Sequence, residues 1–346
     1  MKRRPTIRDV AKAAGVSVGS VSRVLNDGPY ASTNLKSKVA RAIRDLDYQP
    51  DVVAQSMRLR STLTIGCMLS EFTNPMYAEI VDAIEERLQR ESYLLVCATT
   101  RNDAARETAM ISSIRRRRMD GLIVMAGNET FSEVNSALTG LEIPTVLVDR
   151  DIPTNYDAIY VDHRGGAIEA TRYLIGLGHR RIALLMPSVQ VRPGRERAEG
   201  YKAALIEAGL PVDPDMIRPQ KASTSFAFSE VDRLLQTDDP PTAVITLGTR
   251  MLAGVLKAVS SRGLSIPEDI SIVSVGDTDI VRCAAPAITA IKWDLTEQGR
   301  GAAELLIEQL GGATRTTPVH LSLPTELIIR NSCAAPRPKT KKRARG

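Results

Sequence analysis

The chain has 346 residues, of which 43% are hydrophobic and 25% charged, and its net charge is +6. This length exceeds one compact core, so we expect two or three folded units. No run of eighteen apolar residues occurs, and no apolar stretch follows the basic N-terminus. The sequence therefore predicts neither a membrane span nor a secretory signal, and it favours a cytoplasmic location.

Basic charge is concentrated at the two ends of the chain. Residues 1–60 carry twelve Lys and Arg against five Asp and Glu, and residues 337–346 carry six basic residues and no acid. Between them, residues 61–336 carry 28 basic and 35 acidic side chains. This distribution is typical of a small nucleic-acid-binding head on a larger, acidic body.

The cysteines and histidines indicate no metal site. None of the four cysteines sits in a CxxC pair, and the three histidines lack the spacing of metal ligands. We therefore expect reduced, buried thiols and no metal or cofactor.

Helical spacing of apolar residues predicts three short helices in the first fifty residues. They cover residues 6–14, 18–25 and about 33–46. Thr6 with Asp9 has the pattern of a capping box, Gly15 permits a tight turn, and Ser17 can cap the second helix. This arrangement fits a helix-turn-helix, although an ordinary helical hairpin with solvated charges has the same pattern.

The second helix is the expected recognition helix. Its outward positions are Gly19, Ser20, Ser22 and Arg23. Arg23 can reach a base edge or a phosphate. Thr6 and Ser17 lie at helix N-termini, where backbone N–H groups can bind phosphates.

From residue 63 onward, short apolar runs alternate with amphipathic helical stretches. The runs cover residues 63–69, 93–98, 121–126, 145–149, 159–162, 181–186, 243–248 and 270–276. Continuous apolar strands separated by helices predict parallel sheets covered on both faces, and this number favours two sheets with a cleft between them. The tail at 335–346 is rich in Pro, Lys and Arg and is expected to be disordered.

The chain resembles the LacI/GalR family of bacterial regulators. The resemblance is carried by TIRDVAKAAGVSVGSVSRVLN at 6–26 and KVARAIRDLDYQPDVVAQSMR at 38–58. Further matching segments follow in family order up to PTELIIR at 324–330, so the similarity covers essentially residues 5–332. It implies an all-α helix-turn-helix head and an α/β periplasmic-binding-protein-like body with two doubly wound subdomains.

The resemblance also implies domain boundaries. They are a head at 1–50, a hinge helix at 51–60, an N-subdomain at 61–162 plus 293–322, a C-subdomain at 163–291 plus 323–332, and the tail at 335–346.

DNA-contacting positions follow from the same resemblance. They are Thr6, Ser17, Val18, Gly19, Ser20, Ser22, Arg23, Asn26, Val53, Ala54 and Met57. Val18 and Gly19 lie where family members carry their main specificity residues, and Met57 stands where a leucine wedge is usual. The expected partners are a second copy of the chain and a pseudo-palindromic operator. The tail lacks the leucine heptads of a tetramerising coil, so a dimer is preferred.

The resemblance further places a small-molecule effector in the cleft. The implied contacts are Phe72, Asn74, Tyr77, Arg101, Asp149, Arg150, Arg192, Arg197, Trp293 and Asp277. For Trp293, core packing is the rival interpretation, and for Arg150 it is a salt bridge. Effector binding would act by population shift between open and closed clefts.

Two departures from the family pattern bear on the ligand. Gly248-Thr249 and Gly276-Asp277 replace polar pairs that often hold sugar hydroxyls. The candidate cleft arginines are Arg101, Arg150, Arg192, Arg195 and Arg197. Together these features favour an anionic ligand, a sugar acid or a phosphorylated sugar. A neutral sugar or a nucleobase-type ligand remains an alternative.

Proteins with this body fold can have two other functions, those of a solute-binding protein and of an enzyme. A solute-binding protein would need a signal sequence and no head. An enzyme would need a motif such as a P-loop, GxSxG or a strand-following GxGxxG, and the sequence has none of them. We therefore expect a regulator that acts as a repressor, and no catalytic residues.

Overall fold

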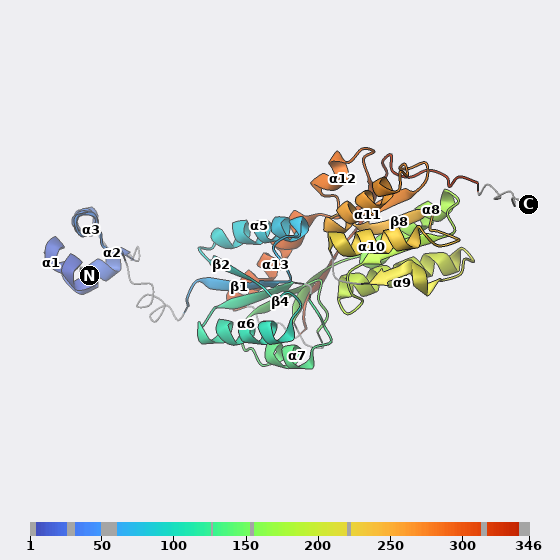
Figure 1. Cartoon of the computed structure of the whole chain (residues 1–346). Helices are drawn as coiled ribbons and strands as arrows, with labels where there is room; N and C mark the ends of the chain where they lie inside the picture. Colours follow the sequence, from blue (N-terminus) through green and yellow to red (C-terminus); the bar gives the residue numbers. More distant parts are fainter. Residues whose placement is uncertain are drawn as a thin grey trace, which may run out of the picture. The chain divides into compact units, whose positions relative to one another are not determined.

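The structure is a computed structural model that describes residues 5–25, 32–49, 61–125, 127–152, 156–219, 223–312 and 317–338 (Figure 1). The chain divides into two compact units, Met1–Thr62 and Leu63–Gly346. The hinge helix expected at 51–60 lies outside the described residues.

The smaller unit contains three short helices. They are α1 (Ile7–Ala14), α2 (Val18–Leu25) and α3 (Thr33–Leu46). The N–H of Thr6 donates to Asp9 Oδ2 over 2.8 Å, so the expected capping box starts α1. Gly15 ends α1 with φ +65°, a conformation that favours glycine. Val10, Val21 and Val39, one from each helix, are fully buried and form the core.

The larger unit contains two six-stranded sheets. The first has the strand order β11-β5-β4-β3-β1-β2, and all of its strands are parallel. Its strands are β1 (Thr64–Leu69), β2 (Leu94–Thr99), β3 (Gly121–Met125), β4 (Thr145–Val148), β5 (Asp157–Val161) and β11 (His320–Leu323). Its helices are α5 (Pro75–Gln89), α6 (Ala104–Arg116), α7 (Ser132–Thr139) and α13 (Leu295–Leu310). α5 pairs with α13 and α6 with α7, so a separate apolar core covers each face of the sheet.

The second sheet has the order β12-β10-β9-β8-β6-β7, in which β12 alone runs antiparallel to its neighbour. Its strands are β6 (Ile182–Met186), β7 (Ile217–Pro219), β8 (Ala243–Leu247), β9 (Ser271–Val275), β10 (Thr289–Lys292) and β12 (Glu326–Ile328). The α-helices of this subdomain are α8 (His163–Gly176), α9 (Arg192–Glu207), α10 (Thr224–Leu234), α11 (Arg250–Ser261) and α12 (Asp279–Cys283), and η1 (Pro214–Met216) is a 3-10 turn. α8 pairs with α9, and α10 with α11.

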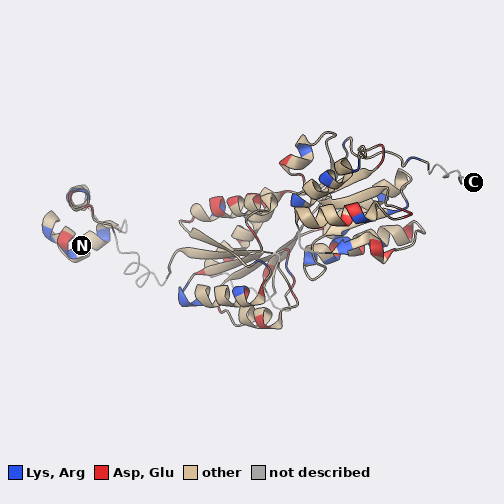
Figure 2. Ribbon diagram, in the orientation of Figure 1, with Lys and Arg blue, Asp and Glu red and all other residues tan. Residues whose placement is uncertain are grey.

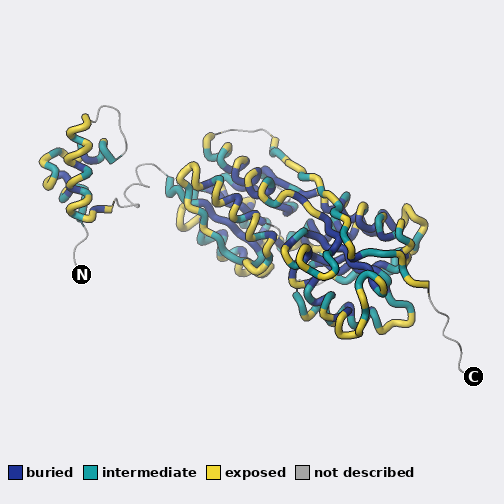
Figure 3. The backbone as a smooth tube through the Cα atoms, turned by 90° about the horizontal axis from the view of Figure 1, so that it is seen from above, coloured by how far each residue is buried: buried dark blue, intermediate teal, exposed yellow. Residues whose placement is uncertain are grey.

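The chain passes between the two sheets three times. It crosses from β5 to α8, from β10 to α13, and from β11 to β12. Each of the eight apolar runs forms a strand, and the predicted pair of doubly wound sheets is confirmed. Their central strands are buried on both faces, as Figure 3 shows by the dark tube through each subdomain. The short strands β7, β10, β11 and β12 were not among the apolar runs.

The start of the expected disordered tail is ordered in the structure. His179 Nε2 lies 3.0 Å from the carbonyl oxygen of Ala334, and Arg337 Nη1 forms an ion pair with Asp269 over 2.5 Å. Residues 335–338 are therefore fixed to the second sheet's subdomain. Residues 339–346 lie outside the described residues.

Candidate functional site

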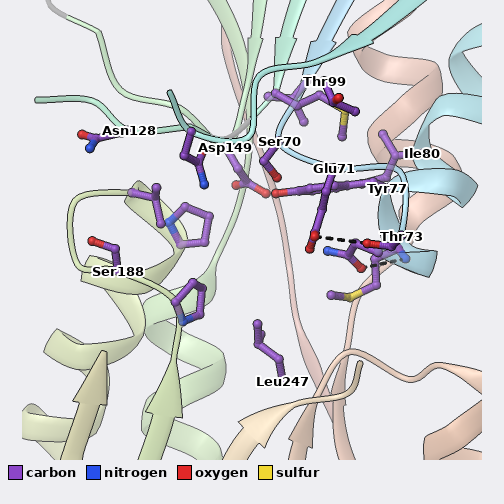
Figure 4. A pocket seen from close by; sticks show the side chains of 18 of the residues that line it. Ser70, Glu71, Thr73, Tyr77, Ile80, Thr99, Asn128, Asp149, Ser188 and Leu247 are labelled. Carbon is purple, nitrogen blue, oxygen red and sulfur yellow. Dashed lines mark hydrogen bonds between the residues drawn. The ribbon is translucent and has the colours of Figure 1, made fainter. Parts of the chain in front are cut away.

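A cavity of about 950 Å³ lies between the two subdomains of the larger unit. Its lining includes loops that follow β1, β2, β3 and β4 of the first sheet and β6, β7 and β8 of the second. In Figure 4, Tyr77 and Asp149 reach it from the first subdomain, and Ser188 and Leu247 from the second. Carboxyl ends of parallel strands are the usual ligand sites of doubly wound sheets.

Seven of the ten predicted effector contacts line this cavity. They are Phe72, Asn74, Tyr77, Arg101, Asp149, Arg197 and Trp293. Phe72 and Tyr77 are aromatic residues of the lining. Phe72 is 58% exposed, and Tyr77 lies at the start of α5. Asn74 also caps α5, because its Oδ1 accepts from the N–H of Met76 over 3.1 Å.

A buried chain of polar groups crosses the cavity wall from one subdomain to the other. Trp293 Nε1 donates to Gln298 Oε1 over 2.9 Å, and Gln298 Nε2 donates to Asp149 Oδ2 over 2.8 Å. The same carboxylate oxygen lies 3.2 Å from His163 Nε2. His163 Nδ1 lies 3.1 Å from Arg197 Nη2.

The direction of these contacts fixes the proton on His163. A guanidinium can only donate, so Nδ1 accepts from Arg197 and Nε2 carries the hydrogen that faces Asp149. Burial lowers the pKa of His163 and the nearby Arg197 lowers it further, which outweighs the opposite effect of Asp149. His163 is therefore neutral at pH 7. Burial would raise the pKa of Asp149, but its contacts with His163, Val161 and Gln298 bring it below the ordinary value.

Arg197 is buried without a carboxylate in ion-pairing contact among the described residues. Its exposed fraction is 5%, its Nε has no hydrogen-bond partner there, and its one side-chain bond is to the neutral His163. Burial lowers its pKa to about 10. A buried cation that faces a cavity and keeps an unused donor is suited to an acceptor group supplied by a ligand.

Arg150 is placed elsewhere. It is 1% exposed, and its Nη2 lies 3.0 Å from Glu107 Oε2 inside the first subdomain. Gly127 leaves room for it, because a Cβ there would lie 2.8 Å from Arg150 Nη1. The salt-bridge interpretation of Arg150 therefore fits the structure, and its guanidinium is not among the cavity-lining groups.

Arg192 and Arg195 bridge the subdomains at one rim of the cavity. Both contact Asp151, at 3.1 and 2.7 Å, and Arg195 also lies 3.0 Å from Glu129. Arg192 also covers the ring of Tyr160, 4.1 Å from the centroid. Both guanidinium groups thus form ion pairs with carboxylates of the protein. Their placement does not support the expectation that they face the ligand.

Asp277 is also absent from the lining. It is paired with Arg330, whose Nη1 lies 2.8 Å from Oδ1, and Arg282 lies 3.6 Å away. These contacts join the loop after β9 to the segment after β12, so the Asp277 carboxylate has a structural role.

Sequence reasoning missed several polar groups of the cavity. Gln298 and the ion pair between Glu71 and Arg250 join residues far apart in the chain, and nothing in their local sequence marks them. That ion pair links the loop after β1 to the start of α11, so it also bridges the two subdomains. Among the described residues, no group of three or more metal-ligating side chains occurs, and no helix is long and apolar enough to cross a membrane.

In the smaller unit, α2 presents its predicted contact positions outward. Ser17, Gly19 and Arg23 are exposed, and Val18 is 41% exposed. Ser17 Oγ accepts from the N–H of Ser20 over 3.1 Å, which caps the helix. Ser22 and Thr6 are partly buried. The other predicted contacts lie outside the described residues: Asn26, Val53, Ala54 and Met57.

Comparison with known proteins agrees with this architecture. Residues 6–51 match the family "Bacterial regulatory proteins, lacI family", and residues 171–333 match a "Periplasmic binding protein-like domain". The transcriptional repressor PurR of Haemophilus influenzae (strain PittEE) is 31% identical over 94% of this chain and 98% of its own length. The ribose operon repressor of the same species (strain ATCC 51907) is 31% identical over 88% of this chain and 92% of its own.

Solved structures show the same relationship. The lac repressor dimer bound to operator and an anti-inducer is 27% identical and superposes with a TM-score of 0.86 over 96% of this chain and all of its own. The regulator CelR in complex with cellobiose is 30% identical, with a TM-score of 0.73 over 95% of this chain and all of its own. The chain belongs to the LacI family of bacterial regulatory proteins.

Proposed function

We propose that this regulator is a repressor that binds a pseudo-palindromic operator as a homodimer and is controlled by a small ligand in the cavity. The observation that carries the proposal is the pairing, in one chain, of an exposed recognition helix with a cavity that holds a buried and incompletely bonded Arg197. The two similar proteins named as repressors support the first part. The lac repressor dimer on operator supports the mode of assembly.

DNA recognition would begin at α2. Arg23 is exposed and offers the five donors of a guanidinium to guanine or to phosphate. Gly19 contributes no side chain, so the base contacts of this helix would rest on Val18, Ser20 and Arg23. By family resemblance we also propose DNA contacts for Asn26, Val53, Ala54 and Met57, which lie outside the described residues.

The cavity favours a polar ligand with an acceptor group, and we propose a sugar acid. Arg197 would donate to its carboxylate, Asp149 would accept from hydroxyl groups, and Phe72 and Tyr77 would cover an apolar face. The charged lining groups are Arg101, Arg197 and Arg250 against Glu71 and Asp149. The cationic excess is smaller than the sequence indicated, because Arg150, Arg192 and Arg195 have carboxylate partners.

Ligand control would act through the two rims. Glu71 with Arg250 at one rim, and Asp151 with Arg192 at the other, hold the subdomains together in the described state. A ligand that bonds Asp149 and Arg197 at once would favour the closed arrangement by its differential affinity. The closed arrangement would then change the operator affinity of the dimer.

Operator binding is tested by fluorescence anisotropy with duplexes from the region upstream of the protein's own gene. We expect nanomolar binding that weakens steeply with salt. Arg23→Ala should reduce affinity about 10-fold or more, by loss of about 1–3 kcal/mol at one base contact. Arg233→Ala, on α10, is the matched control and should bind as the unchanged protein does. Equal affinity for all unrelated duplexes would contradict the proposal.

The ligand class is tested by isothermal titration calorimetry with sugar acids, phosphorylated sugars, nucleobases and neutral sugars. We expect a sugar acid to bind most tightly, and Arg197→Met to weaken it at least 10-fold. Tighter binding of a neutral sugar or a nucleobase would reject the sugar acid while leaving the ligand-controlled repressor standing.

A further inference from the structure

Four consecutive arginines, Arg115 to Arg118, end α6 and precede β3. All four are exposed. Among the described residues, no carboxylate forms an ion pair with Arg115, Arg116 or Arg117, and the one side-chain bond of these three runs from Arg116 to Ser113 Oγ over 3.1 Å. We call Arg115 to Arg118 the arginine edge.

Most arginines of this unit are used differently. Carboxylates within 4.0 Å pair with many of them, for example Arg87, Arg172, Arg181, Arg218, Arg233 and Arg262. Residues 61–336 also carry more acids than bases. Three of the four arginines, Arg115 to Arg117, have no carboxylate partner among the described residues. Their positive charge on an otherwise acidic body lowers the potential energy of a polyanion at that edge. Figure 2 shows this basic end of α6.

The arginine edge lies where the chain enters the larger unit. β1 and β3 are parallel neighbours with Ile65 opposite Gly121, so the segments before them end at the same sheet edge. The N–H of Asp120 donates to the carbonyl of Thr64 over 2.9 Å, which joins the end of the arginine run to the first residue of β1. The head is joined covalently to the body at this edge. DNA held by the head is therefore present there at a high effective concentration.

Stabilisation of the helix end does not account for the whole run. Arg115 and Arg116 lie in the last turn of α6, where positive charge complements the helix dipole. Arg117 is the C-cap and Arg118 lies beyond it. Arg118 has φ +52°, in the left-handed region that favours glycine, so the position carries an arginine where another residue would be easier to accommodate.

We infer that the arginine edge binds DNA phosphates beside the operator, and so adds a sequence-independent contact made by the effector-binding body. The inference rests on the proposed function, because it requires the head to bring DNA to the body. Guanidinium groups suit phosphate oxygens, and each neutralised phosphate releases a counterion. The contact would raise affinity for operator in long DNA without changing which operator is chosen.

The test compares two duplexes: the operator alone, and the operator extended by about ten base pairs on each side, one helical turn. Dissociation constants are measured by fluorescence anisotropy over a series of salt concentrations. The unchanged protein should bind the long duplex more tightly and with a steeper salt dependence. Arg115→Gln/Arg116→Gln/Arg117→Gln should lose that difference, with the slope falling by about 1–3 per protomer, since each phosphate contact contributes about 0.9. Arg118 is kept, because it makes a contact of its own.

Two matched variants separate charge at this edge from other effects. Arg172→Gln/Arg233→Gln/Arg300→Gln removes three exposed arginines that have carboxylate partners, and should keep the steep slope. Arg115→Lys/Arg116→Lys/Arg117→Lys keeps the positive charge, so its binding to the long duplex should keep the steep salt dependence. If the glutamine variant unfolds, the lysine variant takes its place in the test. Its salt slope should then be steeper on the long duplex than on the operator alone.

Two results would overturn the inference. If the glutamine variant and the unchanged protein have equal salt slopes on the long duplex while operator binding is intact, the arginine edge does not bind DNA. The proposed function would still stand. Absence of DNA binding by the unchanged protein on either duplex would overturn the proposed function and this inference together.

Discussion

Two fully buried arginines of the larger unit behave in opposite ways. Arg150 lies inside the first subdomain with the carboxylate of Glu107 at 3.0 Å. Arg197 lies at the cavity, where its one side-chain partner is the neutral ring of His163. Burying a charge is costly unless it is paired. The charge of Arg150 is paired within the protein, whereas Arg197 keeps an unused donor that we propose a ligand would fill. Burial alone therefore does not distinguish a structural arginine from a candidate binding one, whereas the groups that it contacts do.

The largest expected effect comes from breaking the structural pair. Arg150→Met leaves Glu107 buried and without its cation, so we expect a loss of about 3–5 kcal/mol in the free energy of unfolding. Urea denaturation followed by circular dichroism measures it. The double change Arg150→Met/Glu107→Leu removes both charges and should recover most of the loss. If the double variant is as unstable as the single one, the pair is not what holds this site.

Replacing Arg197 at the cavity should affect ligand affinity rather than stability. Arg197→Met removes a buried cation that has no carboxylate in ion-pairing contact among the described residues, so the free energy of unfolding should stay level or rise. Ligand affinity should fall at least 10-fold, since hydrogen bonds to a charged group contribute about 1.5–3 kcal/mol. Calorimetry and urea denaturation on one preparation test both. A large loss of stability with unchanged ligand affinity would make Arg197 structural like Arg150.

The pH dependence sharpens the role of His163. Its pKa is lowered in the folded protein, so the unfolded chain binds more protons as pH falls through about 6.5. The stability that neutral His163 contributes is thus fully present above that pH and is lost below it. The folded protein protonates at its own lowered pKa, below that of the unfolded chain. Protonated Nδ1 can no longer accept from Arg197, so ligand affinity should weaken only as the pH falls through this lower range.

His163→Gln should flatten this pH dependence of ligand affinity below about pH 6.5. His179 is a matched control, because burial lowers its pKa too, but it binds Thr242 and Ala334 away from the cavity lining. His179→Gln should change only the pH dependence of stability. Identical affinity profiles for the two variants would remove His163 from the binding network.

The smallest effect is expected at the cavity rim. Arg195 is 35% exposed and pairs with Glu129 and Asp151. Partly exposed ion pairs contribute about 0–1 kcal/mol, so Arg195→Gln should lower the free energy of unfolding by no more than that, and less in high salt. A loss as large as that of Arg150→Met would show that the rim is as tightly coupled as the interior pair.

The two sheets could be predicted from the sequence because each of their longer strands is a continuous apolar run. The family resemblance implied that Phe72, Tyr77 and Asp149 contact a ligand in the cleft, and all three line the cavity. The sequence did not separate Arg150 from Arg197, because the deciding partner of Arg150 is 43 residues away. Gln298 lies 149 residues from Asp149 and was missed for the same reason. The strands β7, β10, β11 and β12, of three or four residues each, are too short to give a periodic signal.

The three passages between the sheets have a consequence for how such regulators can be recombined. Each subdomain is assembled from separate stretches of the gene, because β11 and α13 return to the first sheet after the second has been started. A single exchange point within the larger unit therefore yields a hybrid in which at least one subdomain mixes both parents. The head, which ends before the first passage, is the portion that one exchange point transfers whole. One cut can thus separate the head from the candidate ligand site, whereas no single cut separates the two halves of that site.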